Sequence, residues 1–203
     1  MEWVPAVIAV AAGYLIGSVS FSYLLGKLIR GIDIRNHGSG NPGATNTLRV
    51  LGPGPAVSVL ALDIAKGILA VWIGRWLAPD VPVVAILSGF ASIVGHNWPV
   101  FFSFRGGKGI ATMIGVVASL CFLPGLVAGI AGILSIVFTR FVSLGSLVFA
   151  ALLPLSLWAF NREPELIYFS LAVALLAFYR HRTNLVKLAQ GKENKLTFRR
   201  GGK

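Results

Sequence analysis

The sequence predicts an all-α fold, namely a polytopic membrane bundle of seven transmembrane helices. Of its 203 residues, 56% are hydrophobic and only 12% are charged, whereas an ordinary soluble domain has roughly 25% charged residues. The apolar residues fall into seven runs without the period-two alternation of strands, and helices satisfy their own backbone hydrogen bonds in lipid. The expected spans are residues 4–27, 53–77, 81–95, 110–123, 125–139, 142–160 and 165–180.

The distribution of basic residues predicts the orientation of the bundle. The polar connections alternate between rich and poor in lysine and arginine, and the poor side carries only Arg75 and Arg162. By the positive-inside rule the rich side is cytosolic, so the N-terminus lies outside and the C-terminus in the cytosol. The net charge of +11 therefore indicates a membrane protein, and we predict no nucleic-acid partner. The expected cytosolic basic residues are Lys27, Arg30, Arg35, Arg49, Arg105, Lys108, Arg140, Arg180, Arg182, Lys187, Lys192, Lys195, Arg199, Arg200 and Lys203.

Charged residues before the first run and within the second bear on whether these runs are membrane spans. The run 4–27 follows the acidic Glu2, whereas a secretory signal would begin with basic residues, so we expect a retained span. The run 53–77 contains Asp63 and Lys66, which are three residues apart near the expected bilayer centre. Charges at that depth face protein or water. The pair is either a structural ion pair or part of a proton or ion relay.

The third and fourth runs, residues 81–95 and 110–123, are short. At ~1.5 Å per residue, about 15 residues reach only ~22 Å of a hydrocarbon core ~30 Å thick. Either the bilayer thins locally or the connecting loop, residues 96–109, dips into it. A re-entrant hairpin that leaves five full spans is the alternative. The last three runs, separated by Arg140 and Arg162, complete the bundle.

Cysteine and histidine are too sparse to suggest metal or disulfide chemistry. Cys121 is the single cysteine and lies in an apolar run, so it forms no disulfide framework or thiolate site. The three histidines are scattered, and the expected cytosolic side offers only Asp33 and Glu193 as acidic partners. We therefore predict neither a metal nor a cofactor. The histidines are His37, His96 and His181.

The first cytosolic connection contains a glycine-rich polar loop. It reads Gly38-Ser39-Gly40-Asn41-Pro42-Gly43-Ala44-Thr45-Asn46-Thr47-Leu48-Arg49. Glycines let backbone N–H groups approach an anion closely, and the hydroxyl, amide and guanidinium side chains add donors. Its G-x-G-x-x-G spacing does not indicate a dinucleotide site, because no βαβ unit surrounds it. We predict a phosphate cradle that lies against the membrane.

The second cytosolic connection ends in a glycine turn that leads directly into a helix. The turn reads Gly106-Gly107-Lys108-Gly109. Unpaired N–H groups, the positive end of the helix dipole and an ammonium converge there, which favours anion binding. A flexible turn with a lipid-facing lysine is the alternative. A Walker A site is excluded, since Gly109 stands where serine or threonine would bind magnesium.

The third polar stretch follows the seventh run and begins with His181 and Arg182. If the helix continues, His181 and Asn184 are three residues apart and share one face. A histidine at a helix end is either a cap or headgroup contact or a functional group. Its position on the same side as the glycine-rich loops favours a function. We expect residues 197–203 to form a solvated basic tail near anionic headgroups.

Together these stretches resemble the bacterial acylphosphate:glycerol-3-phosphate acyltransferase family of membrane enzymes. Residues 38–49 match its motif GSGNPGxTNxxR. Residues 95–101 match GHxxPxF, and residues 106–112 match GGKGxAT. Residues 181–193 match HRxNxxRLxxGxE, except that Lys187 stands where arginine is frequent. That difference keeps the charge and removes a bidentate contact.

The resemblance covers the whole chain and implies a reaction. A fatty acyl group passes from acyl phosphate to the 1-hydroxyl of glycerol 3-phosphate, giving 1-acyl-glycerol 3-phosphate and phosphate, without acyl-CoA as the direct donor. We expect a single domain, residues 1–203, that acts as a monomer in the bacterial cytoplasmic membrane among membrane lipids. Its active site would face the cytosol and consist of loops 28–52 and 96–109 and the tail 181–203.

On this basis the candidate residues take separate roles. Ser39 and Arg49 would hold one phosphate, and Lys108 with the N–H groups of its glycine turn would neutralise the other. His181 is the candidate base, with the leaving phosphate as the alternative proton acceptor. The expected catalytic residues are Ser39, Arg49, Lys108, His181 and Asn184. Further substrate contacts are expected from Gly38, Gly40, Asn41, Thr45, Asn46, His96, Gly106, Gly107, Arg182 and Glu193.

Two alternatives concern the mechanism and the function. Direct transfer is favoured over a covalent acyl-enzyme at Ser39, because this serine has no adjacent base in the sequence. A transporter for a phosphorylated metabolite, with Asp63 and Lys66 as its midplane site, is the alternative function. Against it, nearly all polar groups lie on one side, whereas alternating access needs a site reachable from both. A structural scaffold gives no reason for the two glycine-rich loops to coexist.

Overall fold

The computed structural model describes residues 3–196, and no strand occurs among them. The all-α prediction is confirmed for this part of the chain. Two short 3-10 turns, η1 (Ile34–Asn36) and η2 (Val100–Phe102), lie in the connections. The helices are α1 (Trp3–Gly17), α2 (Phe21–Arg30), α3 (Ala44–Leu51), α4 (Pro53–Leu77), α5 (Pro82–Asn97), α6 (Ile110–Leu120), α7 (Phe122–Thr139), α8 (Val142–Ala159), α9 (Pro164–Arg180) and α10 (Arg182–Ala189).

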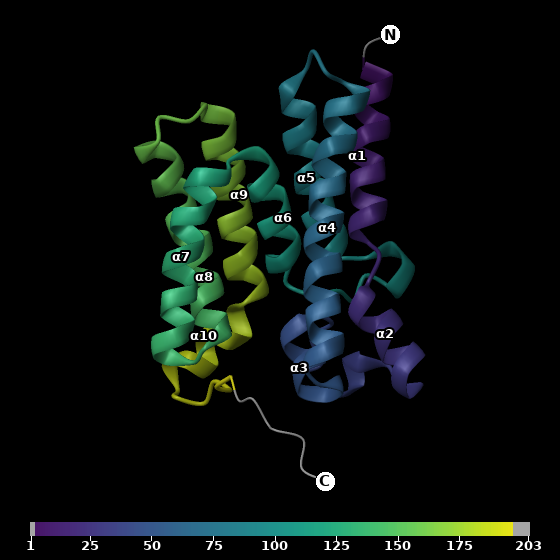
Figure 1. Cartoon of the computed structure of the whole chain (residues 1–203), viewed down its shortest axis with the longest axis vertical. Coiled ribbons are helices and arrows are strands. Elements are labelled where there is room, and N and C mark those ends of the chain that lie inside the picture. The colour runs from purple at the N-terminus through teal and green to yellow at the C-terminus, as the bar shows by residue number, and fades with distance from the viewer. Residues whose placement is uncertain (1–2, 197–203) are drawn as a thin grey trace.

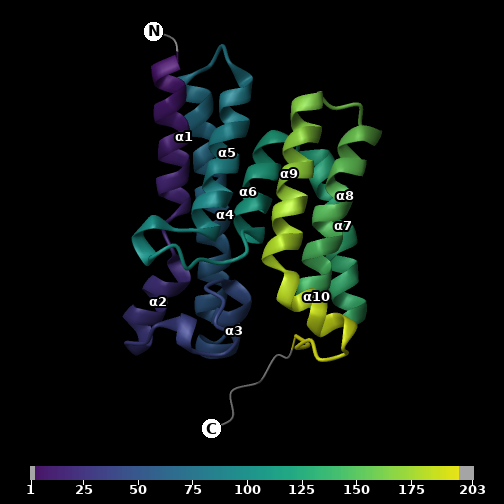
Figure 2. The ribbon, with the colours of Figure 1, turned by 180° about the vertical axis from the view of Figure 1, so that it is seen from behind.

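The helices form two groups, with α6 between them (Figures 1 and 2). One group contains α1, α4 and α5, with α2 and α3 at one end; the other contains α7, α8 and α9, with α10 at the same end. The most extensive contacts are those of α1 with α5, α7 with α8 and α4 with α6. Helix α9 touches both α5 and α6, and α6 touches α7, so these contacts join the two groups.

Small residues allow the central helices to approach closely. A Cβ atom added to Gly67 of α4 would overlap the carbonyl oxygen of Thr112 in α6, and one added to Gly115 of α6 would overlap that of Ile64 in α4. The two backbones therefore touch directly. Such glycine contacts are typical of helix pairs in lipid, where packing takes over from the hydrophobic effect. This contact fixes α6, and with it the loop that precedes α6.

Five helical segments of the described chain are long and apolar enough to cross a membrane. They are Trp3–Arg30, Pro53–Leu77, Pro82–Phe102, Phe122–Thr139 and Val142–Ala159. The short fourth run of the sequence forms the 11-residue α6, and the seventh forms the 17-residue α9. Apart from the first run, the helices thus fall on the expected segments, and length and composition identify five candidate spans among the described residues.

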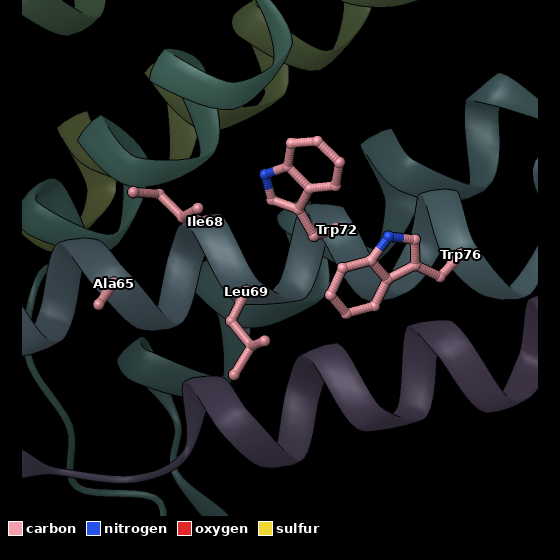
Figure 3. A pocket seen from close by; sticks show the side chains of 5 residues that line it. All are labelled: Ala65, Ile68, Leu69, Trp72 and Trp76. Atoms are coloured by element: carbon pink, nitrogen blue, oxygen red, sulfur yellow. The ribbon is translucent and has the colours of Figure 1, made fainter.

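The outer surface of these helices is apolar, as expected for contact with lipid. Figure 3 shows an open depression on α4 lined by the side chains of Ala65, Ile68, Leu69, Trp72 and Trp76. The rings of Trp72 and Trp76 are 6.0 Å apart and tilted. Indole rings prefer the boundary between hydrocarbon and headgroups. This depression has no charged lining residue, and lipid chains fit it better than a polar ligand does.

The prediction of one uninterrupted helix over residues 4–27 was wrong. The chain breaks between Gly17 and Phe21, and α2 begins on a new axis (Figure 2). The break frees a carbonyl oxygen at Val19, which accepts a hydrogen bond of 2.9 Å from Nζ of Lys66. The Ser18 hydroxyl donates to the carbonyl oxygen of Tyr14 at 2.8 Å. A buried break is tolerated because these partners are supplied from within the protein.

Two further helix boundaries differ from the sequence-based expectation. Residues 44–51, expected as part of a polar loop, form helix α3, whose first turn is closed by a bond of 3.1 Å from the Thr47 hydroxyl to the Gly43 carbonyl oxygen. The helix of the seventh run does not continue into the third polar stretch. It ends at Arg180, and α10 starts after His181.

The connection between α5 and α6 lies partway along the bundle and not at its end (Figures 1 and 2). Its first residues contact the middle of other helices: His96 Nδ1 is 2.9 Å from Nζ of Lys66, which lies near the middle of the 25-residue α4. The Tyr14 hydroxyl of α1 donates to the carbonyl oxygen of Trp98 at 2.9 Å. This is the geometry expected of a polar loop that enters the bilayer between its neighbours.

Candidate active site

Asn46 holds the first glycine-rich loop in shape. Its buried side chain accepts from the Ser39 N–H at 2.8 Å through Oδ1 and donates to the His37 carbonyl oxygen at 3.0 Å through Nδ2. Gly38 and Gly40 have φ of 62° and 72°, a region that other residues rarely adopt. The loop therefore turns sharply around Asn46, and the side chain of Ser39 is left exposed. Asn46 was expected to contact the substrate, but its side chain instead makes hydrogen bonds to the backbone of its own loop.

The remaining candidates of the first loop lie around the start and end of α3. Asn41 and Thr45 are half-buried near the N-terminal end of this helix. Arg49 is exposed in its last turn. The charge of Arg49 is near enough to contribute to lowering the pKa of Lys108. The first loop thus exposes the hydroxyl of Ser39 and the guanidinium of Arg49.

The two glycine-rich loops meet at Gly107. A Cβ atom at this buried position would overlap the His96 ring at Nε2 and would lie 2.8 Å from the carbonyl oxygen of Pro42. Glycine is therefore required for the loops to touch. The Gly107 N–H donates to the His96 carbonyl oxygen at 3.0 Å. The expectation that this N–H is free for phosphate was wrong, because the hydrogen bond closes the loop on itself.

Arg35 makes a second link between the loops. Asp33 accepts from Arg35 N at 3.0 Å and pairs with its guanidinium at 2.8 Å, and Arg35 in turn donates to the Phe102 carbonyl oxygen at 2.9 Å. The hydrogen bond from Arg35 lowers the pKa of Asp33. Sequence analysis missed this link. In the sequence, only the spacing of Asp33 two positions before Arg35 indicated an ion pair here.

Arg180 fixes the glycine turn from the end of α9. Its guanidinium donates to the carbonyl oxygen of Gly106 at 2.9 Å and to that of Gly107 at 2.6 and 2.9 Å, and it stacks over the Trp98 ring at 5.2 Å. Because Arg180 binds both carbonyl oxygens, it fixes the backbone of the turn immediately before Lys108. Arg180 was not among the predicted site residues, since an arginine at the end of an apolar run is normally a membrane anchor.

Lys108 begins a chain of polar contacts that joins four parts of the molecule. Its Nζ donates to Oδ1 of Asn184 in α10. Asn184 Nδ2 donates to Oε1 of Glu193 at 2.8 Å, and the Ser143 hydroxyl of α8 donates to the same oxygen at 2.8 Å. Burial lowers the pKa of Lys108 to about 8, against the opposing effect of Glu193. We name this set of four residues the Lys108 chain.

His181 is buried at the junction of α9 and α10, with 2% of its surface exposed. Its Nδ1 lies 2.8 Å from the carbonyl oxygen of Ala177. A carbonyl oxygen only accepts, so Nδ1 carries the proton and Nε2 keeps its lone pair. Burial, and then the charge of Lys108, lower the pKa of His181 to about 4. The ring is therefore neutral at pH 7, with a nitrogen able to accept a proton.

Two candidates of the third stretch have other contacts. Arg182 is exposed, donates to the Tyr179 carbonyl oxygen at 3.1 Å, and lies over the Tyr179 ring at 4.7 Å. It does not contact the Lys108 chain within the described residues. Glu193, expected among the substrate contacts, accepts from Asn184 and Ser143 and so ties its segment to α8 and α10.

The charged pair Asp63 and Lys66 of α4 is linked to this site through His96. Lys66 Nζ is 2.7 Å from Oδ1 of Asp63, 2.9 Å from the Val19 carbonyl oxygen and 2.9 Å from Nδ1 of His96. Asp63 and Lys66 are 2% and 3% exposed. The expected ion pair is present, and its link to His96, 30 residues away in the chain, was not foreseen.

An apolar groove starts next to the glycine turn. It has a volume of about 270 Å³ and lies between α6, α7 and α8. Ile110, two residues after Lys108, lines its start, and Gly125 and Gly129 of α7 leave room along its length. Its width comes from small residues, and its wall is almost wholly hydrocarbon. A groove of this kind beside a cation suits an amphiphile with an anionic head.

The comparison with known proteins agrees with this geometry. Residues 7–191 match the family described as glycerol-3-phosphate acyltransferase. The glycerol-3-phosphate acyltransferase of Shouchella clausii (strain KSM-K16) is 57% identical over 95% of this chain and 97% of its own length. That of Halalkalibacterium halodurans is 54% identical over 92% of this chain and 93% of its own.

A solved structure has the same fold. The crystal structure of PlsY (YgiH), described as an integral membrane glycerol 3-phosphate acyltransferase in its glycerol 3-phosphate form, is 35% identical, with a TM-score of 0.89. The match covers 95% of this chain and 96% of that one. With the family match over residues 7–191 and the close relatives, this likeness decides the assignment. The chain belongs to the glycerol-3-phosphate acyltransferase family.

Proposed function

We propose that this protein transfers a fatty acyl group from acyl phosphate to the 1-hydroxyl of glycerol 3-phosphate, releasing phosphate and 1-acyl-glycerol 3-phosphate. The observation that carries the proposal is the position of Lys108: it follows Gly107, where the two glycine-rich loops meet, and precedes by two residues Ile110, which lines the apolar groove. Both substrates carry phosphate, and one carries a fatty chain. A site with both a cation and an apolar groove fits acyl phosphate together with glycerol 3-phosphate.

Two phosphates need two neighbouring sets of donors. We assign Ser39 and Arg49 of the first loop to one phosphate and Lys108 to the other. The contact between the loops at Gly107 supports this pairing, because it brings the two sets side by side. Positioned cations would supply the largest part of the catalysis, since two anions are brought together in a site of low dielectric. Further contacts are assigned to Gly38, Gly40, Asn41, Thr45 and Gly106.

Removal of the hydroxyl proton is assigned to His181 or to the leaving phosphate. The lone pair on Nε2 of His181 supports the first choice. Its pKa of about 4 makes it a weak base in the free protein. A bound phosphate dianion would raise that pKa, because an opposite charge favours the protonated ring. Transfer is direct, without an acyl-enzyme at Ser39, because phosphate is already a good leaving group.

The proposal includes the apolar groove and the membrane topology. The fatty chain would lie along α6 and α7, with its reactive end at Lys108. The bundle would have seven spans, with the N-terminus outside, the C-terminus and the site facing the cytosol, and a bacterial cytoplasmic membrane around it. The protein would act as one domain and as a monomer. The part of the predicted basic tail formed by residues 197–203 lies outside the described residues.

Phosphate release by the purified protein in detergent tests the function. Palmitoyl phosphate and glycerol 3-phosphate should together give phosphate, while palmitoyl-CoA with glycerol 3-phosphate, followed by the release of free CoA thiol, should give no product. Ser39→Ala and His181→Ala should each abolish most of the release, whereas Lys192→Ala, an exposed lysine on the same side, should leave it unchanged. Turnover with the thioester alone would refute the donor. No turnover with either donor in folded protein would refute the proposal, and uptake into sealed vesicles would then test transport.

Mass measurement tests direct transfer. Protein incubated with palmitoyl phosphate alone should keep its mass, because no covalent acyl-enzyme forms. A stable palmitoyl adduct on Ser39 would contradict this part of the proposal while leaving the overall reaction intact.

A further inference from the structure

The ammonium of Lys66 determines which nitrogen of His96 carries the proton. An ammonium has three N–H donors and no acceptor. Nζ of Lys66 lies within 2.9 Å of His96 Nδ1 and of the Val19 carbonyl oxygen, and 2.7 Å from Asp63 Oδ1. A proton on Nδ1 would face one of the ammonium protons. The ring nitrogen is therefore the acceptor, and the proton of a neutral His96 resides on Nε2.

We propose that Lys66, held in place by Asp63, is a positioning residue of the acyltransferase site. It acts through His96, whose Nε2–H it directs at the point where the two glycine-rich loops meet. Nε2 lies against Gly107, on the side where the Pro42 carbonyl oxygen also lies. The inference rests on the proposed function in one respect: the N–H serves as a neutral donor for a substrate oxygen bound at that junction.

The site then contains two imidazoles with opposite tautomers. His181 donates through Nδ1 to a carbonyl oxygen and keeps a lone pair on Nε2, whereas His96 accepts at Nδ1 and carries its proton on Nε2. Of these two rings, only His181 has a lone pair on Nε2 to accept the hydroxyl proton, and only His96 has its proton on Nε2, where a neutral N–H can donate to a substrate. The Lys66 ammonium thus makes His96 a donor while His181 remains a proton acceptor, although neither Lys66 nor Asp63 touches the substrate.

The charged groups that face His96 come from two helices. Asp63 and Lys66 approach from α4, and Arg180 of α9 acts on the ring from the side of the glycine turn. Asp63 Oδ1 is 3.6 Å from Nδ1 and favours a proton there. Lys66 and Arg180 oppose it. Removing the Lys66 ammonium leaves a carboxylate facing Nδ1, so the ring should gain a proton on that nitrogen.

A purely structural role for Lys66 predicts a different result. Its bond to the Val19 carbonyl oxygen stabilises the break between α1 and α2, and loss of that bond would lower activity through loss of folded protein. Such an effect would leave the protonation of His96 unchanged. The state of the ring therefore separates the two explanations.

Ring-nitrogen NMR of nitrogen-labelled histidine in the purified full-length protein is the test. The His96 signals, identified by their absence from His96→Gln, should show a protonated Nε2 and an unprotonated Nδ1. Lys66→Met should move the proton to Nδ1 or protonate both nitrogens, and phosphate release should fall about tenfold through kcat, the loss expected for one buried hydrogen bond. Lys66→Arg, which also has donors only, should keep the wild-type ring state.

Arg75→Met is the matched control. Arg75 is the other cation of α4, and its guanidinium donates to the Ser119 carbonyl oxygen at 2.7 Å; within the described residues it makes no hydrogen bond to His96. This variant should keep the wild-type His96 signals. A wild-type ring protonated on Nδ1, or unchanged His96 signals in Lys66→Met, would overturn the inference. If Lys66→Met does not fold, the wild-type spectrum decides. Absent phosphate release with the expected ring state would refute the proposed function and the donor role, and leave the tautomer assignment standing.

Discussion

Lys66 of α4 and Lys108 of the loop before α6 are both withdrawn from solvent, but their partners differ. Lys66 lies 2.7 Å from a carboxylate, Asp63, and both side chains are almost fully buried. Lys108 donates to the neutral amide of Asn184, and the carboxylate of Glu193 stands one residue further along the chain of contacts. The first charge is neutralised within the protein. The second has a carboxylate only at one remove, which is the arrangement that the proposed binding of phosphate requires.

The difference explains why two lysines in one bundle can have different functions. A buried ion pair is costly to create and costly to break, so it preserves a geometry. A cation held by an amide keeps its position without losing its attraction for phosphate. Four measurements test the contrast between the two lysines.

Asp63→Asn should destabilise the protein strongly. It leaves the Lys66 ammonium buried without its counter-ion, which costs roughly 3 kcal/mol or more. Thermal unfolding in detergent, followed by the loss of monodisperse protein, measures the effect. Asp80→Asn, at an exposed position in the turn after α4, is the matched control and should unfold like wild type. Equal unfolding temperatures for the two variants would show that the Asp63–Lys66 pair does not hold the structure.

Lys108→Ala should leave the fold intact and remove most of the activity. The loss of one preorganised charge at a phosphate should lower the rate of phosphate release by about 10²–10³-fold. Lys192→Ala serves as the control for a lost basic residue on the same side. A Lys108→Ala protein with more than half of the wild-type rate would refute the role of this ammonium, and with it the contrast to Lys66.

The pH dependence of substrate binding should follow Lys108. The protonated ammonium binds the phosphate dianion, and its pKa is about 8 in the free protein. The KM for palmitoyl phosphate should therefore be low below this pH and rise about tenfold per unit as the pH increases well above 8. In Lys108→Arg the rise should be absent, because the guanidinium keeps its proton. An unchanged KM between pH 7 and pH 10 in wild type would contradict the prediction.

Ser143→Ala should have the smallest effect. It removes one of the two hydrogen bonds to Oε1 of Glu193 and leaves the bond from Asn184. One such bond contributes about 1 kcal/mol, so activity should fall by less than tenfold. Hydrogen exchange in residues 190–196 should increase, since this segment loses a tie to α8. Ser146→Ala, which loses only a bond within α8, is the control.

Features that depend on the local order of residues could be predicted from the sequence. Apolar runs long enough for helices predicted their positions, and the i, i+3 spacing of Asp63 and Lys66 predicted their ion pair. The glycine motifs indicated where the loops would bend. The break at residues 18–20 could not be foreseen, because the partner that makes it tolerable, Lys66, lies 47 residues further along the chain.

The roles of some site residues were not predicted for the same reason, namely that they depend on contacts between distant parts of the chain. Arg180 is read locally as a membrane anchor, and only the packing of α9 against α5 and α6 brings it to the carbonyl oxygens of the glycine turn. Asn46 looks like a ligand because asparagine often binds phosphate, yet its buried side chain is used up by the backbone of its own loop. Which polar group faces a ligand depends on contacts between distant segments.

The bond between Lys66 and the Val19 carbonyl oxygen has a consequence for biogenesis. The first hydrophobic segment leaves the ribosome 47 residues before the side chain that satisfies its break. At about 5–20 residues per second, this interval lasts several seconds. During that time the segment is an incomplete membrane span, and it is completed only when α4 arrives. The first two segments should thus integrate as a pair, so a nascent chain that ends before Lys66 should be held less firmly in the membrane than one that ends after it.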